Sequence, residues 1–304
     1  MHIPNLMLQG GICPVTAAIS AAALTGFAIA AARAKEKPSA ARAGAVAALI
    51  FAAQMINFPV QSGTSGHLFG GVLASALLGV PFGVLVTALV LLVQSLVFSD
   101  GGLTVLGANV LNMAVLGAGA GGLFFKLLAG SSKRNSGFHL AALGVAAWIS
   151  VMLAAFACSL ELGIAGTASF SSVVNAMLGV HAWIGIGEGV ITAALYHVFS
   201  ARAQSGASKG SAAAILMASA AIAAVLSPFA SSYPDGLEWV AEKYRFLHEA
   251  APSFVSPLQD YSVPFITGSF LSTGLAGLTG VLMTFAAGFF FAGLITRVKT
   301  QASS

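Results

Sequence analysis

From Ala43 to Ser99 the chain contains no Asp, Glu, Lys or Arg, and similar apolar runs recur along the rest of its 304 residues. Only 7% of all residues are charged, compared with about 25% in soluble domains. Long continuous apolar runs favour membrane-spanning helices over a β-barrel, whose strands would alternate in short segments. The sequence therefore predicts an all-α integral membrane protein.

Polar and basic loops divide the apolar sequence into about nine spans. The segment 161–180 is expected to be a softer, partly re-entrant loop, and 201–212 a linker rich in small residues. Seven spans before the linker form one predicted domain (1–203), and two spans around the loop 229–267 form a second (204–304). The predicted spans are 13–33, 43–57, two short spans within 68–98, a run ending near 130, 138–160, 181–200, 212–228 and 268–295.

The basic residues predict the orientation. In this arrangement all but two of the 13 Lys and Arg residues fall on one side, the exceptions being Lys243 and Arg245. Basic loops face the cytoplasm, so the amino terminus is expected outside and the carboxyl terminus inside, in a plasma membrane. No basic residue precedes the first span, which is the reverse of a secretory signal, and the terminus is expected to be retained.

The first two residues, Met1 and His2, form a potential chelate for a transition-metal ion. The amine of Met1, the amide nitrogen of His2 and Nδ1 of its imidazole would close a five-membered and a six-membered ring. His67, in the polar loop 57–67, is the candidate for the fourth donor, although a histidine beside a helix start can also be purely structural. Four nitrogens in a plane suit Ni²⁺ or Cu²⁺. Because binding expels protons from the amine and the amide, uptake should weaken as the pH falls.

Four other residues are candidates for a supporting role around the metal. Glu188 is the only acid that the predicted spans place well inside the membrane, where an ionisable side chain suggests function, although helix packing is an equal alternative. Asn109 could orient the ligand or bond a neighbouring helix, and His181 is an alternative fourth donor. Ser65 belongs to the same loop as His67.

Several functions find no support in the sequence. The chain lacks a phosphate-binding loop motif and a dinucleotide fingerprint, so it is not expected to hydrolyse ATP or to bind an organic cofactor. Without paired carboxylates or a nucleophile–base set, it is not expected to be an enzyme. A stand-alone permease driven by ion gradients remains the alternative, but such a carrier would be expected to have internal repeats and several intramembrane acids.

Several motifs together resemble a known family. The start Met1-His2-Ile3-Pro4, the loop 57–67, the segment 106–109 and the segment 181–188 are similar to the CbiM/NikM proteins, the substrate-specificity components of cobalt and nickel energy-coupling-factor (ECF) transporters. The segment 233–238, Tyr-Pro-Asp-Gly-Leu-Glu, resembles the PDGLE domain of the small CbiN/NikN component. One departure is Asn5-Leu6, where family members commonly have Asp-Gly.

The resemblance implies a seven-helix substrate-binding unit that holds its metal through Met1, His2 and His67, fused to the PDGLE unit. It also implies Ni²⁺ or Co²⁺ as the transported substrate. The expected partners are a CbiQ/NikQ-like transmembrane coupling subunit and two CbiO/NikO-like ATP-binding subunits. A fusion of the two parts is more typical of nickel systems than of cobalt systems.

Overall fold

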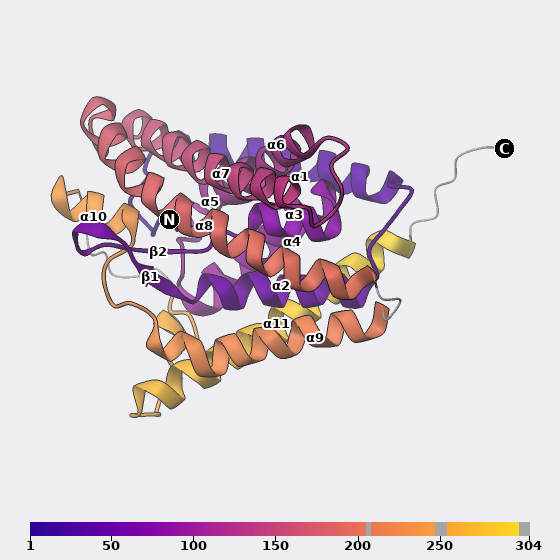
Figure 1. Cartoon of the computed structure of the whole chain (residues 1–304). Helices are drawn as coiled ribbons and strands as arrows, with labels where there is room; N and C mark the ends of the chain where they lie inside the picture. The colour runs from indigo at the N-terminus through magenta and orange to yellow at the C-terminus, as the bar shows by residue number, and fades with distance from the viewer. Residues whose placement is uncertain (205–207, 247–253, 298–304) are drawn as a thin grey trace.

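The computed structural model describes residues 1–204, 208–246 and 254–297, which form an elongated helical bundle (Figure 1). Within this part of the chain, seven helical segments are long and apolar enough to cross a membrane. They are α1 (Ile12–Arg33); α4 (Val80–Val93) with the π-helical turn η2 (Gln94–Phe98); α5 (Leu106–Asn109) continued by η3 (Val110–Ala120) and α6 (Gly121–Ala129); α7 (Gly137–Ile164); Phe170–Ser200 of α8 (Phe170–Gln204); Ser211–Phe229, which is most of α9 (Ser208–Ala221) with η4 (Ile222–Leu226) and η5 (Ser227–Phe229); and α11 (Ser269–Arg297).

The short helix α2 (Ala40–Gln54) lies at the centre of the bundle. It is apolar but only 15 residues long, and Ala43 to Gln54 are all buried. The carboxy-terminal helix α11 packs directly on it: a Cβ on Gly280 would lie 2.0 Å from the Phe51 ring, and one on Gly44 would lie 2.6 Å from the Phe285 carbonyl oxygen. Small residues permit this close packing of helices. The two units expected from the sequence therefore share one core.

The segment predicted as two short spans consists of unequal parts. Helix α3 (Gly71–Leu78) has eight residues, which cover about 12 Å, whereas α4 with η2 has 19 residues, about 28 Å. Strand β2 ends at His67, and residues 68–70 lead from it into α3 as non-helical backbone, with Gly70 in the left-handed region at a φ of 70°. The helical hairpin with its turn at Gly79 is thus preceded by a short non-helical segment, which hydropathy alone does not reveal.

Two expectations about loops are wrong. Helix α7 continues to Ile164 and α8 begins at Phe170, so 161–180 is mostly helical, and Glu161 is a second acid buried inside a span. The Nδ2 of Asn112 donates a hydrogen bond to Glu161 at 2.7 Å. Helix α8 extends to Gln204 and α9 (Ser208–Ala221) starts soon after, so helices occupy most of the expected linker and only 205–207 lie outside the described residues.

A small hairpin and the PDGLE segment lie together at one end of the bundle, near the amino terminus (Figure 1). Strand β1 (Asn57–Pro59) pairs antiparallel with β2 (Ser65–His67) around η1 (Gln61–Gly63). Helix α10 (Gly236–Lys243) is preceded by its N-cap, Asp235, whose side chain forms a capping box with Glu238. The Ser65 amide donates to the Pro234 carbonyl oxygen at 2.8 Å, which joins the hairpin to this segment.

Candidate metal centre

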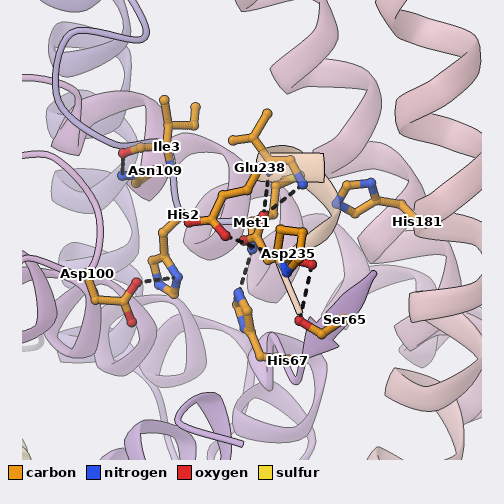
Figure 2. Close-up of polar contacts among 12 residues, drawn as sticks. Met1, His2, Ile3, Ser65, His67, Asp100, Asn109, His181, Asp235 and Glu238 are labelled. Carbon is orange, nitrogen blue, oxygen red and sulfur yellow. Dashed lines mark hydrogen bonds and ion pairs between the residues drawn. The ribbon is translucent and has the colours of Figure 1, made fainter. Parts of the chain in front are cut away.

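The amine of Met1 lies at the centre of a buried polar cluster (Figure 2). It is 2.5 Å from Nε2 of His67 and 3.0 Å from Oδ2 of Asp235, and Met1 is only 3% exposed. Three segments far apart in the sequence meet at this atom: the amino terminus, the end of β2 and the start of α10. The structure therefore brings together two of the predicted donors, the amine and His67.

His67 is held in an orientation that suits metal binding. Its Nδ1 lies 3.1 Å from the carbonyl oxygen of Leu68, which favours a proton on Nδ1 and leaves the lone pair of Nε2 directed at the amine. Burial, and then the neighbouring ammonium group, lower the pKa of His67 to about 3. The imidazole is consequently neutral at physiological pH, the form that binds a metal ion.

His2 completes the cluster but is turned toward a carboxylate. Its ring stacks on that of His67 with centroids 4.9 Å apart, and its Nδ1 lies 3.0 Å from Oδ1 of Asp100. Burial, and then the ammonium group, lower the pKa of His2 to about 3, so the neutral ring donates its Nδ1 proton to Asp100. For Nδ1 to join the chelate, the imidazole must rotate away from Asp100 and move its proton to Nε2.

Asn109 fixes the backbone that follows His2. The Ile3 amide donates to Oδ1 of Asn109 at 2.8 Å, and Nδ2 of Asn109 donates to the Ile3 carbonyl oxygen at 3.1 Å. The same carbonyl accepts the amide of Gly102 at 2.8 Å. Asn109 thus acts on the chain terminus rather than on a neighbouring helix.

Asn5 and Leu6 retain a tight turn after Pro4. Oδ1 of Asn5 accepts hydrogen bonds from the amide and the hydroxyl of Thr104 at 3.2 and 3.0 Å. Leu6 has a φ of 67°, in the left-handed region, which costs a non-glycine residue about 1–2 kcal/mol. The turn therefore forms without the glycine that is common in the family, and the hydrogen bonds of Asn5 help to hold it.

Glu188 supports the backbone beside His67. Its fully buried carboxylate accepts the amide of Phe69 at 2.6 Å and the amide of Gly70 at 3.0 Å. These two amides belong to the residues immediately before α3, where the helix itself offers them no acceptor. Glu188 is therefore a positioning residue that anchors the chain two and three residues after His67.

Replacing Glu188 should weaken metal binding without touching a donor atom. The change Glu188→Ala leaves two buried amides unpaired, and we expect metal affinity to fall by about 10- to 100-fold, the usual effect of losing an outer-shell partner. The isosteric change Glu188→Gln keeps one acceptor oxygen and should have an intermediate effect. Calorimetric titration of the purified variants measures both; equal affinity of Glu188→Ala and the parent would contradict this role.

Ser65 and His181 contact the PDGLE segment. The Ser65 hydroxyl donates to the Tyr233 carbonyl oxygen at 2.7 Å. Nδ1 of His181 lies 2.8 Å from the Met177 carbonyl oxygen of its own helix, and a Cβ on Gly236 would lie 2.9 Å from Cε1 of His181. Only glycine therefore fits at position 236 against this ring. His248, a histidine of the predicted loop 229–267, lies outside the described residues.

Sequence reasoning did not find the two acids of the cluster, Asp100 and Asp235. The hydroxyl of Tyr261 donates to Oδ2 of Asp100 at 2.5 Å, and burial raises the pKa of Asp100. Burial alone would also raise the pKa of Asp235, but the ammonium group and His67 lower it below its ordinary value. In the sequence, Asp100 is only an acid in a polar loop, and Asp235 is only one residue of the motif that resembles the PDGLE domain.

The cluster has no preformed cage of side chains. Among the described residues, no three His, Cys, Asp or Glu side chains converge closely enough to hold a metal ion. A site built here must therefore draw on main-chain nitrogens, and the amine and the His2 amide are the ones beside the two imidazoles.

Comparison with known proteins places the chain in a family. A family model described as "Cobalt uptake substrate-specific transmembrane region", CbiM, matches residues 2–206, and a second, described as "PDGLE domain", matches residues 209–297. The chain belongs to the CbiM family, in a form fused to a PDGLE domain. It is thus a multi-pass membrane protein of the metal-uptake class.

One relative covers nearly the whole chain, and another covers about half of it. It is 34% identical over 298 residues to the "Putative fused nickel transport protein NikMN" of Archaeoglobus fulgidus, which covers 95% of this chain and 97% of that protein. It is 36% identical over 167 residues to the "Cobalt transport protein CbiM" of Sorangium cellulosum, covering 52% of this chain and 72% of that protein.

A solved structure supports the fold. The "Crystal Structure of an Truncated Transition metal Transporter" matches with a TM-score of 0.58 and 27% identity, covering 66% of this chain and 99% of that one. The expectation of an all-α membrane bundle of this family is confirmed.

Proposed function

We propose that this protein is the substrate-binding membrane component of an ATP-driven ECF-type transporter, and that it captures Ni²⁺ at the extracytoplasmic face. The observation that carries the proposal is the buried amine of Met1 at 2.5 Å from Nε2 of His67, with His2 stacked beside it. The ion would be held by the Met1 amine, the amide nitrogen and Nδ1 of His2, and Nε2 of His67.

The charge balance of the cluster supports this coordination. In the structure the ammonium group faces the carboxylate of Asp235. Binding a divalent ion through this chelate releases one proton from the ammonium group and one from the His2 amide. The ion and the amide anion together carry one positive charge, the same as the ammonium group that they replace. Asp235 therefore remains balanced in both states, and the main electrostatic effect of acidification is competition by two protons.

Nickel is the favoured substrate, with cobalt as the second candidate. Four nitrogen donors in a plane suit Ni²⁺ better than oxygen-rich octahedral sites do. The fusion of both family parts in one chain matches the NikMN relative along nearly its whole length. Cobalt remains the second candidate because the relative from Sorangium cellulosum is a cobalt transport protein.

We infer that release of the ion into the cytoplasm depends on a CbiQ/NikQ-like coupling subunit and two CbiO/NikO-like ATP-binding subunits. Helix α1 is the least buried of the seven apolar helices in the described part of the chain and offers a face to such a subunit. The alternative, a stand-alone permease, needs an intramembrane acid to carry a coupling ion. Glu188 is committed to two backbone amides, which disfavours that role.

Uptake of radioactive nickel by cells tests this function. Cells that produce the chain together with the coupling and ATP-binding subunits should accumulate nickel, and deletion of the ATP-binding subunits should reduce accumulation to the background of cells without the chain. Cobalt competition in the same assay establishes the preferred ion. Unchanged accumulation without the ATP-binding subunits would favour the permease.

A further inference from the structure

A polar cavity of about 310 Å³ adjoins the proposed metal centre. It lies between the two family segments, because His2, Gln54 and His67 line it from the CbiM part. Asp235, Asp260 and Tyr261 line it from the PDGLE part. The cavity thus exists only where both parts are packed together.

The charge around this cavity favours cations. Four carboxylates line it, those of Asp100, Asp235, Glu238 and Asp260, whereas the positive charge beside them is the ammonium group of Met1. Glu238 and Asp260 are exposed, and Asp100 and Asp235 lie deeper, so negative charge extends from the surface to the histidines. A cleft lined by one sign of charge concentrates ions of the other sign.

Two buried polar atoms of the lining have no protein partner. Gln54 is 3% exposed; its Nε2 donates to the Phe69 carbonyl oxygen at 2.8 Å, which leaves Oε1 without a hydrogen bond. Nε2 of His2, in a residue 8% exposed, is also without a partner. Buried polar groups are normally satisfied, so these atoms indicate a ligand or water in the cavity.

The size and the ligand geometry indicate a hydrated ion rather than a bare one. Six waters need about 180 Å³ at the ~30 Å³ that each occupies in the liquid, which the cavity can hold. No three acidic or histidine side chains of the described residues converge for direct coordination. Asp100 and Asp235 already accept hydrogen bonds, from Tyr261 and from the amide of Leu237 respectively.

We propose that this cavity is a second cation site, in which a divalent transition-metal ion is held with its water shell by Asp260, Glu238, Asp100 and Gln54 before it loses water to the nitrogen donors. The proposal rests on the proposed function of the adjoining metal centre. It assigns to the PDGLE part a direct share in collecting the ion, because Asp260 and Glu238 come from that part.

Rapid-mixing measurement of Ni²⁺ capture by the purified full chain tests the second site. The change Asp260→Asn should slow association by about three- to tenfold at low ionic strength, with the dissociation rate and the absorption spectrum of the bound ion unchanged. Position 260 has a φ of 51°, which Asn tolerates well, so the backbone is preserved. Glu242→Gln is the matched control, because Glu242 is an exposed acid of α10 that does not line the cavity.

Hexaamminecobalt(III) provides a direct probe of binding without loss of the inner shell, because it does not exchange its ligands. It should slow Ni²⁺ capture by the parent and by Glu242→Gln, and do so much less with Asp260→Asn. Equal association rates for the parent and Asp260→Asn would overturn the second site. Equal slowing of Glu242→Gln and Asp260→Asn by hexaamminecobalt(III) would also overturn it. Absence of Ni²⁺ binding by the parent would instead reject the metal centre itself.

Discussion

A single glycine added before Met1 should abolish tight nickel binding while the protein stays folded. The extension converts the amine of Met1 into an amide and places the new amine one residue further from His67. The amine is enclosed by Nε2 of His67 at 2.5 Å and Oδ2 of Asp235 at 3.0 Å, so the structure leaves little space for an added residue. We expect the affinity to fall by at least about a thousandfold, equivalent to ~4 kcal/mol.

The measurement is calorimetric or spectroscopic titration of the purified variant with Ni²⁺. Intact mass establishes that the parent begins at Met1 and that the variant retains its glycine. The same glycine added after Ser304 is the control and should bind like the parent. Thermal unfolding separates loss of the chelate from loss of the fold, since most of the core lies away from Met1. An extended protein that binds as tightly as the parent would reject the amine as a donor.

Much of the fold could be predicted because apolar runs leave few alternatives in a membrane. The positions of α1, α7 and α11 follow from continuous apolar sequence bounded by basic or polar residues. The hairpin of α3 and α4 could be anticipated only in outline. The non-helical backbone that leads into it donates two amides to Glu188, a residue more than a hundred positions away. A contact between residues so far apart in the sequence cannot be predicted from hydropathy.

The part of the candidate site whose donors are adjacent in the sequence could be predicted. Met1 and His2 are adjacent, and their chelate rings depend only on covalent geometry. Asp100 and Asp235 reach the same cluster through the tertiary packing of α4 and α10, and sequence spacing gives no indication of it. Their carboxylates explain how an ammonium group and a hydrogen-bonded imidazole are stabilised in a buried site before any ion arrives.

Replacing His67 with alanine should have the second largest effect. The change His67→Ala removes the predicted fourth donor and leaves the amine with Asp235 alone, so we expect nickel affinity to fall by roughly a hundredfold or more, ~3 kcal/mol. The matched variant His181→Ala removes the same side chain from a buried position. It should change affinity by less than about threefold, equivalent to ~0.7 kcal/mol, because Nδ1 of His181 bonds to Met177 and its ring packs on Gly236.

Added imidazole distinguishes loss of a donor from damage to the fold. The space left in His67→Ala adjoins the cavity beside the metal centre, so free imidazole can reach the open coordination position and should restore part of the affinity. It should have no such effect on the parent or on His181→Ala. If His181→Ala lost as much affinity as His67→Ala and only the former were rescued, His181 rather than His67 would be the fourth donor. The ring of His181 would then have to move past Gly236 when the ion binds.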